Sequence, residues 1–300
     1  MRIVATALAL ALAAVAVPRA QDRTRLVMLG TGTPNADPDR FGPSVAVVVD
    51  GVAYLVDMGV GVVRRAAAAE RDRGMPGLAA DKLTRVFVTH LHSDHTLGFA
   101  DLILSPWVLE RSEPLEVWGP RGLRAMADHL LAAYAEDIRI RRHGGEPRHH
   151  DEGLRVVTHA IRPGVVYRDA RVRVTAFPVK HGAWPQAFGY TFRTPDRTIV
   201  ISGDTGPDAD IAAQCQRCDI LVHEVYSEAG FRNRPPEWQR YHARYHTSSR
   251  QLAAIASRAR PRLLVLYHQL IWKSTEEDLL KEVRSGYDGQ VVSAHDLDVY

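Results

Sequence analysis

The segment 90–95, His-Leu-His-Ser-Asp-His, constrains this chain more than any other part of its sequence. It follows an apolar run, Arg-Val-Phe-Val-Thr, which predicts a buried strand. Alternate side chains of an extended segment share a face, so His90 and His92 are expected to point the same way. Asp94 and His95 follow a turn and face a second point nearby. Imidazole and carboxylate groups suit divalent zinc, iron or manganese. The segment therefore predicts half of a two-metal site rather than a polar loop with scattered histidines.

Further candidate ligands stand at the ends of other apolar runs. His181, Asp204 and His268 each come directly after a strand-like stretch. Asp57 closes another run, Tyr-Leu-Val-Asp, although an aspartate close to glycine is also a common turn signal. Taken singly, these residues would be a surface histidine, a core histidine and two turn aspartates. Together they predict a site assembled from the loops at several strand ends.

The composition bounds the class of protein. A chain of 300 residues that is 46% hydrophobic can bury a large core, as one large or two fused domains. The formal net charge is only +3, and no basic stripe runs along the sequence. The chain therefore lacks the electrostatic footprint that typically holds nucleic acid.

The first 20 residues have the features of a targeting segment. Arg2 precedes an unbroken apolar run at 3–17, and small residues before Gln21 suit cleavage. We expect a signal peptide at 1–20, a hydrolase domain at 21–300 and a periplasmic or secreted protein. The alternatives are an uncleaved anchor or a buried helix. No later stretch of the sequence is apolar enough to span a bilayer.

The two cysteines, Cys215 and Cys218, are three residues apart. An exported protein could join them in a local disulfide. A zinc site would need two more ligands of the same kind. The sequence favours two partly buried thiols near a helix end, outside the active site.

Apolar runs and turn signals predict the order of elements. Strands are expected at 26–29, 44–50, 53–57, 84–89, 115–118, 154–161, 165–167, 172–178, 188–192, 198–202, 219–222, 263–267 and near 290–299. Helices are expected at 60–71, 97–109, 122–135, 208–217, 248–258 and 275–284. The charge-rich stretch 139–151 predicts an exposed connection. A run of strands with helices between them occurs twice along the chain. This order indicates an α/β fold of two mixed sheets packed face to face, with helices on the outer faces.

The ordered set of polar residues resembles the metallo-β-lactamase superfamily, over essentially the whole chain after residue 20. Three further motifs resemble its ribonuclease Z branch, whose relatives include zinc arylsulfatases. They are Leu-Gly-Thr-Gly-Thr-Pro at 29–34, His-Glu at 223–224 and His-Thr-Ser at 246–248. The resemblance implies an αββα sandwich with a dinuclear site.

The resemblance also implies ligands for two divalent metal ions, zinc in the first place, with manganese or iron as alternatives. The implied ligands are His90, His92 and His181 for one ion, Asp94, His95 and His268 for the other, and Asp204 as the bridge between them. Asp57 would orient a ligand histidine without touching the metal. Seven ligands leave open positions for water, as a catalytic site requires.

The same resemblance implies a proton donor beside the metals. Glu224 would face the site and partner His246, which could protonate the leaving oxygen. The alternative is that His246 merely helps to start a helix and that Glu224 is solvated. The candidate catalytic residues are thus Asp94, Glu224 and His246. Trp184 and Trp272 closely follow two ligand histidines and either line a substrate rim or pack.

These expectations favour an exported dinuclear-metal-dependent hydrolase that cleaves a phosphodiester or related ester, with a water acidified by both ions as nucleophile. The region 96–180 shows no obvious counterpart of the tRNA-gripping arm of ribonuclease Z, and export would separate the protein from cytoplasmic tRNA. A small-molecule ester is therefore favoured over nucleic acid. The alternatives are an arylsulfatase-like, lactone or thioester hydrolase, or a non-catalytic metal-binding protein of the same fold. A homodimer is compatible with the sequence.

Overall fold

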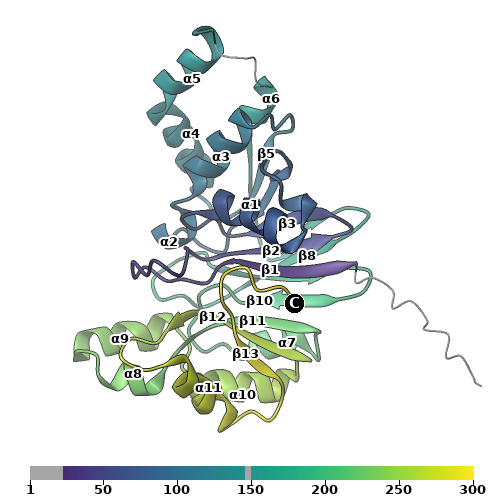
Figure 1. The fold of residues 1–300 in the computed structure, drawn as a ribbon. Coiled ribbons are helices and arrows are strands. Elements are labelled where there is room, and N and C mark those ends of the chain that lie inside the picture. Colours follow the sequence, from purple (N-terminus) through teal and green to yellow (C-terminus); the bar gives the residue numbers. More distant parts are fainter. Residues whose placement is uncertain (1–22, 146–149) are drawn as a thin grey trace, which may run out of the picture.

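The computed structural model describes residues 23–145 and 150–300, so the expected signal peptide at 1–20 lies outside the described residues. Two β-sheets lie face to face, and helices cover their outer faces (Figure 1). The predicted αββα architecture is confirmed. Among the described helices, none has the length and apolar character needed to cross a membrane.

The first sheet has six strands in the order β1-β2-β3-β4-β5-β6. These are β1 (Thr24–Gly30), β2 (Ser44–Val49), β3 (Val52–Val56), β4 (Arg85–Phe87), β5 (Leu115–Gly119) and β6 (Val156–Ala160). Strands β1 to β3 are antiparallel, and β3 to β6 run parallel. The helical segments of this half are α1 (Val62–Arg73), α2 (Ser93–Thr96), α3 (Phe99–Val108), α4 (Leu123–Ala133), α5 (Ala135–His143) and α6 (Asp151–Leu154), with short 3-10 turns at Pro76–Leu78 and Ala80–Lys82.

The second sheet has seven strands in the order β13-β12-β11-β10-β9-β8-β7. These are β7 (Gly164–Arg168), β8 (Arg173–Pro178), β9 (Phe188–Arg193), β10 (Thr198–Ile201), β11 (Ile220–Tyr226), β12 (Leu263–Leu270) and β13 (Val291–Ser293). Strands β7 to β10 are antiparallel, and β10 to β13 are parallel. Its helices are α7 (Asp210–Cys215), α8 (Glu228–Arg232), α9 (Pro236–Tyr245), α10 (Ser249–Ala259) and α11 (Glu276–Arg284).

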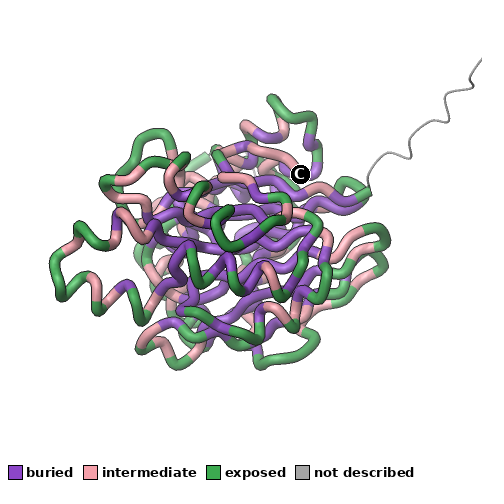
Figure 2. Tube along the Cα trace, turned by 90° about the horizontal axis from the view of Figure 1, so that it is seen from below, coloured by how far each residue is buried: buried purple, intermediate pink, exposed green. Residues whose placement is uncertain are grey.

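Three apolar layers hold these elements together. The middle layer lies between the sheets and includes Met28 and Phe87 from one and Tyr190 and Val265 from the other. A second layer lies under α1, α3 and α4, and a third lies under α7, α10 and α11. The buried parts of the chain run through the interior, and exposed parts form the surface loops (Figure 2). Burial of both faces explains why the strands are apolar on both sides.

Several local predictions were wrong. Part of the expected connection at 139–151 is helical, in α5 and α6. Ion pairs between its own side chains support α5. The helix buries no residue, so the sequence shows no apolar period there. Helices α4 and α5 extend well beyond the sheets (Figure 1). Helices α8 and α9 were not predicted at all. Strands β11 and β12 continue further than expected, through 223–226 and 268–270. Of the expected strand region near 290–299, only β13 is a strand, although Val299 forms a bridge with Val27.

The cysteines also differ from expectation. Cys215 and Cys218 are joined by a disulfide rather than present as thiols. Both are buried in the layer under α7 and α10. The bond closes the turn between α7 and β11, away from the polar cluster described below.

Candidate metal centre

Asp57 fixes the loop that follows β4. It comes directly after β3 with a left-handed backbone (φ 61°) and is buried. Its carboxylate accepts hydrogen bonds from the backbone N–H of Thr89 (2.8 Å) and from the Thr89 hydroxyl (2.9 Å). It also lies 2.8 Å from Nδ1 of His95. The structure thus places Asp57 where the expected orienting role requires it, behind a candidate ligand.

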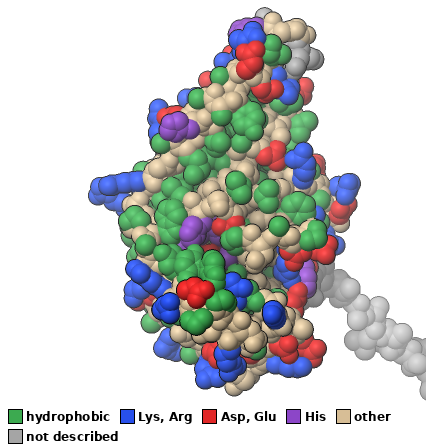
Figure 3. Space-filling model, turned by 90° about the vertical axis from the view of Figure 1, so that its left-hand side faces the viewer, with side chains coloured by type: hydrophobic (Ala, Val, Ile, Leu, Met, Phe, Trp, Pro, Cys, Tyr) green, Lys and Arg blue, Asp and Glu red, His purple; other side chains and the backbone are tan. Residues whose placement is uncertain are grey.

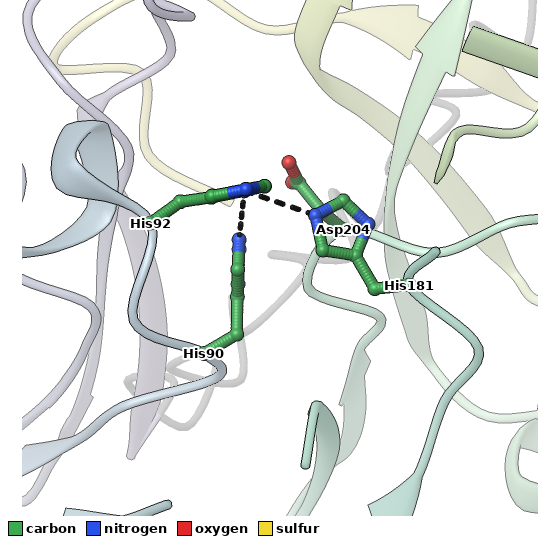
Figure 4. Close-up of side chains that lie close together, drawn as sticks. All are labelled: His90, His92, His181 and Asp204. Atoms are coloured by element: carbon green, nitrogen blue, oxygen red, sulfur yellow. Dashed lines mark hydrogen bonds between the residues drawn. The ribbon is translucent and has the colours of Figure 1, made fainter. Parts of the chain in front are cut away.

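Four candidate ligands converge from both sheets in a first cluster (Figure 4). Nε2 of His90 and Nε2 of His181 each lie 3.0 Å from Nδ1 of His92. Asp204 completes the group, and the ligand atoms of all four lie within 4.8 Å of one another. His90 and His92 follow β4 of the first sheet, whereas His181 and Asp204 follow β8 and β10 of the second.

A second cluster lies beside the first and contains Asp94, His95 and His268. Asp204 also groups with His268 and His246. Nε2 of His268 lies 3.2 Å from Asp94 Oδ2 and 3.4 Å from Asp204 Oδ2. Nε2 of His95 lies 3.4 Å from the other oxygen of Asp204. Asp204, a member of the first cluster, therefore presents one oxygen to each of two histidines of the second, and so lies between the two clusters.

The strand that carries His268 is irregular at that residue. Glu224 of β11 pairs with Tyr267 of β12, but the next residue, Val225, pairs with Gln269. His268 is therefore the extra residue of a β-bulge, and its φ is 45°. Bulges re-aim a side chain, and strained backbone of this kind concentrates at functional sites. Asp57 and His268, on opposite sides of the cluster, both have this conformation.

The hydrogen bonds around the cluster fix which nitrogen of each ring is free. Nδ1 of His181 donates to the carbonyl of Tyr245 (2.8 Å). The Thr89 hydroxyl donates to Asp57, so it must accept from Nδ1 of His90. In each of these two histidines the proton is on Nδ1 and Nε2 carries a lone pair. Two lone pairs therefore point into the first cluster, as ligands of a divalent metal ion do.

The cluster is buried and imperfectly satisfied without a cation. Nε2 of His95 and Oδ1 of Asp204 are buried, and within residues 23–145 and 150–300 neither makes a well-aligned hydrogen bond. Buried polar atoms of this kind require an explanation. Two carboxylates and four or more imidazoles around one point, with unpartnered atoms among them, fit a pair of divalent ions.

Electrostatics within the cluster favour a negative Asp204. Burial alone would raise the pKa of Asp204, but His268 and His95 lower it well below its usual range. Burial would lower the pKa of His95, but Asp204, Asp94 and Asp57 raise it well above the usual value. Burial lowers the pKa of His181 to about 3. The bridging position is therefore ionised, and the rings of the first cluster are neutral ligands.

Glu224 and His246 lie next to this cluster, as the resemblance implied. One Glu224 oxygen accepts from the backbone N–H of Thr247 (2.7 Å), and the other lies 3.3 Å from Nδ1 of His246. Nδ1 of His246 is also 3.9 Å from Asp204 Oδ2. His223 instead binds the backbone carbonyl of Glu224 and belongs to no cluster. The neighbouring residues thus face different ways, and Glu224 is the one that faces the site.

The cluster forms the floor of a cavity of about 430 Å³. Figure 3 shows histidine and acidic side chains together in the middle of one face, with hydrophobic side chains around them. The wall formed by α9 and the segments beside it was not anticipated. It is made of Arg234, Trp238, Tyr241, His242 and Trp272. The spacing of the α9 residues, three or four apart, was the available signal.

Of the two tryptophans considered from sequence, Trp272 lines the cavity. Trp184 contacts a candidate ligand directly, because its indole Nε1 donates to Nε2 of His92 (2.8 Å). The carbonyl of Tyr245 behind His181 is a further contact that sequence could not reveal. All of these groups position the ligand rings or shape the cavity.

Comparisons with known proteins identify the family of this chain. The model of the beta-lactamase superfamily domain matches residues 53–269, which contain every candidate site residue. A ribonuclease Z from Mycobacterium sp. (strain KMS) is 33% identical over 279 residues, covering 91% of this chain and 94% of the relative.

Crystal structures show the same fold at lower identity. The metallo-beta-lactamase fold protein YhfI from Bacillus subtilis superimposes with a TM-score of 0.71 at 16% identity, covering 93% of this chain and 99% of that one. The short form of human tRNase Z, ELAC1, superimposes with a TM-score of 0.67 at 23% identity, covering 92% and 98%. The chain therefore belongs to the metallo-β-lactamase superfamily of hydrolases, and within it to the ribonuclease Z family.

Proposed function

We propose that this protein is a dinuclear-metal-dependent hydrolase that cleaves a phosphodiester or a related ester. One observation carries the proposal. Asp204 lies between two histidine clusters, with Glu224 and His246 immediately beside them. Paired cations about 4 Å apart clamp the attacking and leaving oxygens of a displacement, and an adjacent acid completes the machinery for ester cleavage.

We assign the ions to the ligands implied by the sequence. The first would be held by His90, His92 and His181, the second by Asp94, His95 and His268, and both by Asp204. When bound, the ions supply Lewis acidity, which polarises the ester and lowers the pKa of a coordinated water. Asp57 holds the ring of His95 in place. Zinc suits a set rich in imidazole, and manganese or iron would fit the carboxylates as well.

His246 holds the proton that the leaving oxygen needs. Its ring is buried at the cavity, and Glu224 keeps it in place from behind. Glu224 is itself fixed by the backbone N–H of Thr247. Asp94, which also lines the cavity, would act with them by holding one of the ions. A carboxylate behind an imidazole selects its tautomer and stabilises its cationic form.

A small phosphodiester is the substrate class that we favour. Relatives named ribonuclease Z support phosphodiester chemistry. The size of the cavity suits a small ester, and the sequence has no extended basic stripe for a nucleic acid. A sulfate ester or a lactone could be held by the same floor, so each belongs in the test.

The test uses the purified chain loaded separately with zinc, manganese and iron. Metal content is measured, and turnover is compared for bis(p-nitrophenyl) phosphate, p-nitrophenyl sulfate and a chromogenic lactone. We expect two metal ions per chain and fastest turnover of the phosphodiester. Two bound ions with no turnover of any ester would contradict the enzyme proposal and favour a metal-binding protein. Faster sulfate or lactone cleavage would reassign the substrate class.

We also propose that the protein is exported. The support is the basic start, apolar run and small-residue cleavage signal within residues 1–20. Cell fractionation and mass spectrometry of the mature N-terminus test this. Export predicts a periplasmic or secreted chain that begins near Gln21. A chain that keeps residues 1–20 in the cytoplasm would contradict it.

A further inference from the structure

We propose that the cavity wall formed by α9 and the segments beside it binds an anionic group, a carboxylate or a phosphate, on the leaving portion of the substrate. The inference rests on the proposed function and deepens it by naming a feature of the substrate. Two groups carry it: Arg234, which lies between α8 and α9, and His242 on α9. Both line the cavity whose floor is the metal cluster.

Arg234 is a positive charge without a negative partner. Its guanidinium lies 5.4 Å from the ring centroid of Trp238 and 5.5 Å from that of Trp272. Within the described residues it forms no ion pair, and its buried Nε has no hydrogen-bond partner. Two indole rings hold a guanidinium in place but accept none of its fork of hydrogen bonds. The planar fork suits a carboxylate or phosphate.

His242 adds a second unpartnered group. It is 6% exposed, yet neither ring nitrogen has a hydrogen-bond partner in the part of the chain that the structure describes. Its ring stacks against Trp238 (5.7 Å between centroids) and lies 4.7 Å from the ring of Trp272. Burial, together with the neighbouring His246 and Arg234, lowers the pKa of His242 to about 4. The ring is therefore neutral near pH 7 and offers one N–H.

The position of these groups indicates which part of a substrate they meet. The ring of His242 lies 5.6 Å from that of His246, whose ring lies 5.7 Å from that of His268. His246 therefore stands between the metal cluster and this wall. An oxygen protonated by His246 belongs to the leaving portion, which then extends toward His242 and Arg234.

The charges of the rest of the cavity allow an anion there. The carboxylates that line it, Asp94 and Asp204, belong to the metal cluster, where bound cations would neutralise them. Glu237 and Glu228 lie on the same helices but do not line the cavity. A guanidinium and a neutral imidazole N–H face one space, and no acid among the described residues pairs with them, so they form a subsite for a negative group.

The test compares two substrates that differ only in this group. They are methyl 4-nitrophenyl phosphate and methyl 3-carboxy-4-nitrophenyl phosphate. The metal-loaded enzyme is used, and kcat/KM is measured for each. A third ester, with a phosphonate in place of the carboxylate, separates the two anion classes. We expect kcat/KM to favour the anionic substrates about tenfold. In Arg234→Gln this ratio should fall to near one.

The matched control is Arg240→Gln, which removes an exposed arginine from α9 that does not line the cavity. It should keep the wild-type ratio. If Arg234→Gln slows all three substrates equally, Arg234 only packs the two tryptophans and the proposal is wrong. If Arg240→Gln loses the preference for anionic substrates as fully as Arg234→Gln does, the proposal is also wrong. The overall positive charge of this face would then explain the preference without a specific subsite.

Binding without turnover separates this inference from the function on which it rests. The probes are 3-carboxy-4-nitrophenol and 4-nitrophenol, titrated calorimetrically into the metal-loaded protein. Wild type should bind the carboxylated phenol at least five times more tightly, and His242→Phe and Arg234→Gln should each reduce that preference. Absence of any turnover refutes only the proposed function. Equal affinity for the two phenols refutes the subsite.

Discussion

At the scale of single residues, burial shifts the pKa values of the proton-donor pair, Glu224 and His246, in opposite directions. Burial and the nearby Asp204 raise the pKa of Glu224 well above its usual range. Burial lowers the pKa of His246 to about 4. Before metal binds, the pair is therefore neutral. Cations beside Asp204 would offset its negative charge, so the protonation of the pair is coupled to occupancy of the metal site.

The first prediction concerns His246→Ala. We expect turnover to fall by about 10²- to 10⁴-fold, the usual contribution of a positioned general acid. Metal content should stay at the wild-type value, because the assigned ligands are intact. Turnover and metal analysis on the same preparation check this, with the exposed His129→Ala as control. Loss of metal in His246→Ala would make it a ligand, since it lies near Asp204 and His268.

Arg111 is a buried charge that serves the fold rather than the site. It is completely buried, and its guanidinium donates five hydrogen bonds to four backbone carbonyls, those of Leu83, Leu102, Ile103 and Gly153. It thereby joins α3, α6 and the segment before β4. Burial lowers its pKa to about 10, which still leaves it charged near neutral pH.

The second prediction is that Arg111→Met lowers the free energy of unfolding by about 3 kcal/mol, because buried carbonyls lose charged donors that methionine cannot replace. Urea unfolding checks this. Arg121→Met, an exposed arginine on the same half, should change stability by less than about 0.5 kcal/mol. A small loss in both variants would mean that water replaces the guanidinium.

Residues differ in how visible their roles are in the sequence. Histidines and aspartates at strand ends are conspicuous, and the geometry brings the expected ligands together. Arg111 looks like any other arginine, because its partners are backbone carbonyls up to 42 residues away. Trp184 was considered only as rim or packing, since its contact with His92 depends on two loops meeting.

At the scale of elements, α8, the helix that leads into the cavity wall, is held at its start by a carboxylate from a neighbouring helix. Glu282 of α11 accepts from the backbone N–H groups of Glu228 and Ala229 (both 2.9 Å), at the start of α8. It also accepts from the hydroxyls of Ser227 (3.1 Å) and Ser249 (2.6 Å). A negative charge at the first turn of a helix satisfies N–H groups that the helix leaves free. α8 is thus held by α11 as well as by its own N-cap, the Ser227 hydroxyl, which accepts from the backbone N–H of Gly230 (3.1 Å).

The third prediction follows from this contact. Glu282→Ala should lower the free energy of unfolding by about 1–2 kcal/mol, as the loss of a helix cap does, and should speed amide exchange in 228–245. Hydrogen exchange with mass spectrometry measures both helices directly. Glu277→Ala on α11, whose ion-pair partner is Lys281 on the same exposed surface, serves as the control. Unchanged exchange in 228–232 would show that α8 does not need the carboxylate.

The helices that the sequence analysis missed, α8 and α9, each bury only one residue. α9 buries only His242, and its other large side chains stack on each other, as Tyr241 and Tyr245 do. The core strands and the helices over them were predicted because burial imposes periodicity. α9 carries aromatic residues three or four apart, but they are mixed with charged residues and only His242 is buried, so α9 was found only in the structure.

At the scale of the whole molecule, the two halves meet at the cluster. The segment 90–95 follows the first sheet, whereas His181, Asp204 and His268 come from the second. The order of elements predicted two sheets, but sequence alone could not say which loops face each other across them. Bound ions would cross-link the halves, so metal should stabilise the entire fold.

The fourth prediction is therefore that removal of metal lowers the melting temperature. Ligand at 100 times its dissociation constant contributes about 2.7 kcal/mol, which corresponds to roughly 4–5 °C for a domain of this size. Scanning calorimetry with and without a chelator measures the shift. Asp204→Ala should lose metal and show no chelator effect. An identical melting temperature with and without chelator in the wild type would exclude a structural contribution of the ions.

The sheets are also joined far from the site, by Asp169 in the turn between β7 and β8. Its carboxylate accepts from the hydroxyl of Tyr54, on β3 of the opposite sheet, and from that of Tyr167 (3.0 Å). The backbone N–H groups of Arg171 (2.7 Å) and Val172 (2.8 Å) complete the set. Burial would raise the pKa of Asp169, but these four donors lower it below the usual value.

The fifth prediction is that this contact is sensitive to acid. A carboxylate whose pKa is lower in the folded protein stabilises the fold above its unfolded pKa of about 3.9, and this contribution disappears as pH falls through the folded pKa. Asp169→Asn should cost about 1–2 kcal/mol at pH 7 and progressively less below pH 4. Urea unfolding between pH 3 and 7 measures the difference from wild type, with the exposed Asp81→Asn as control. A difference that stays constant over this range would show that the hydrogen bonds do not depend on the charge, and that the two sheets are joined there by packing alone.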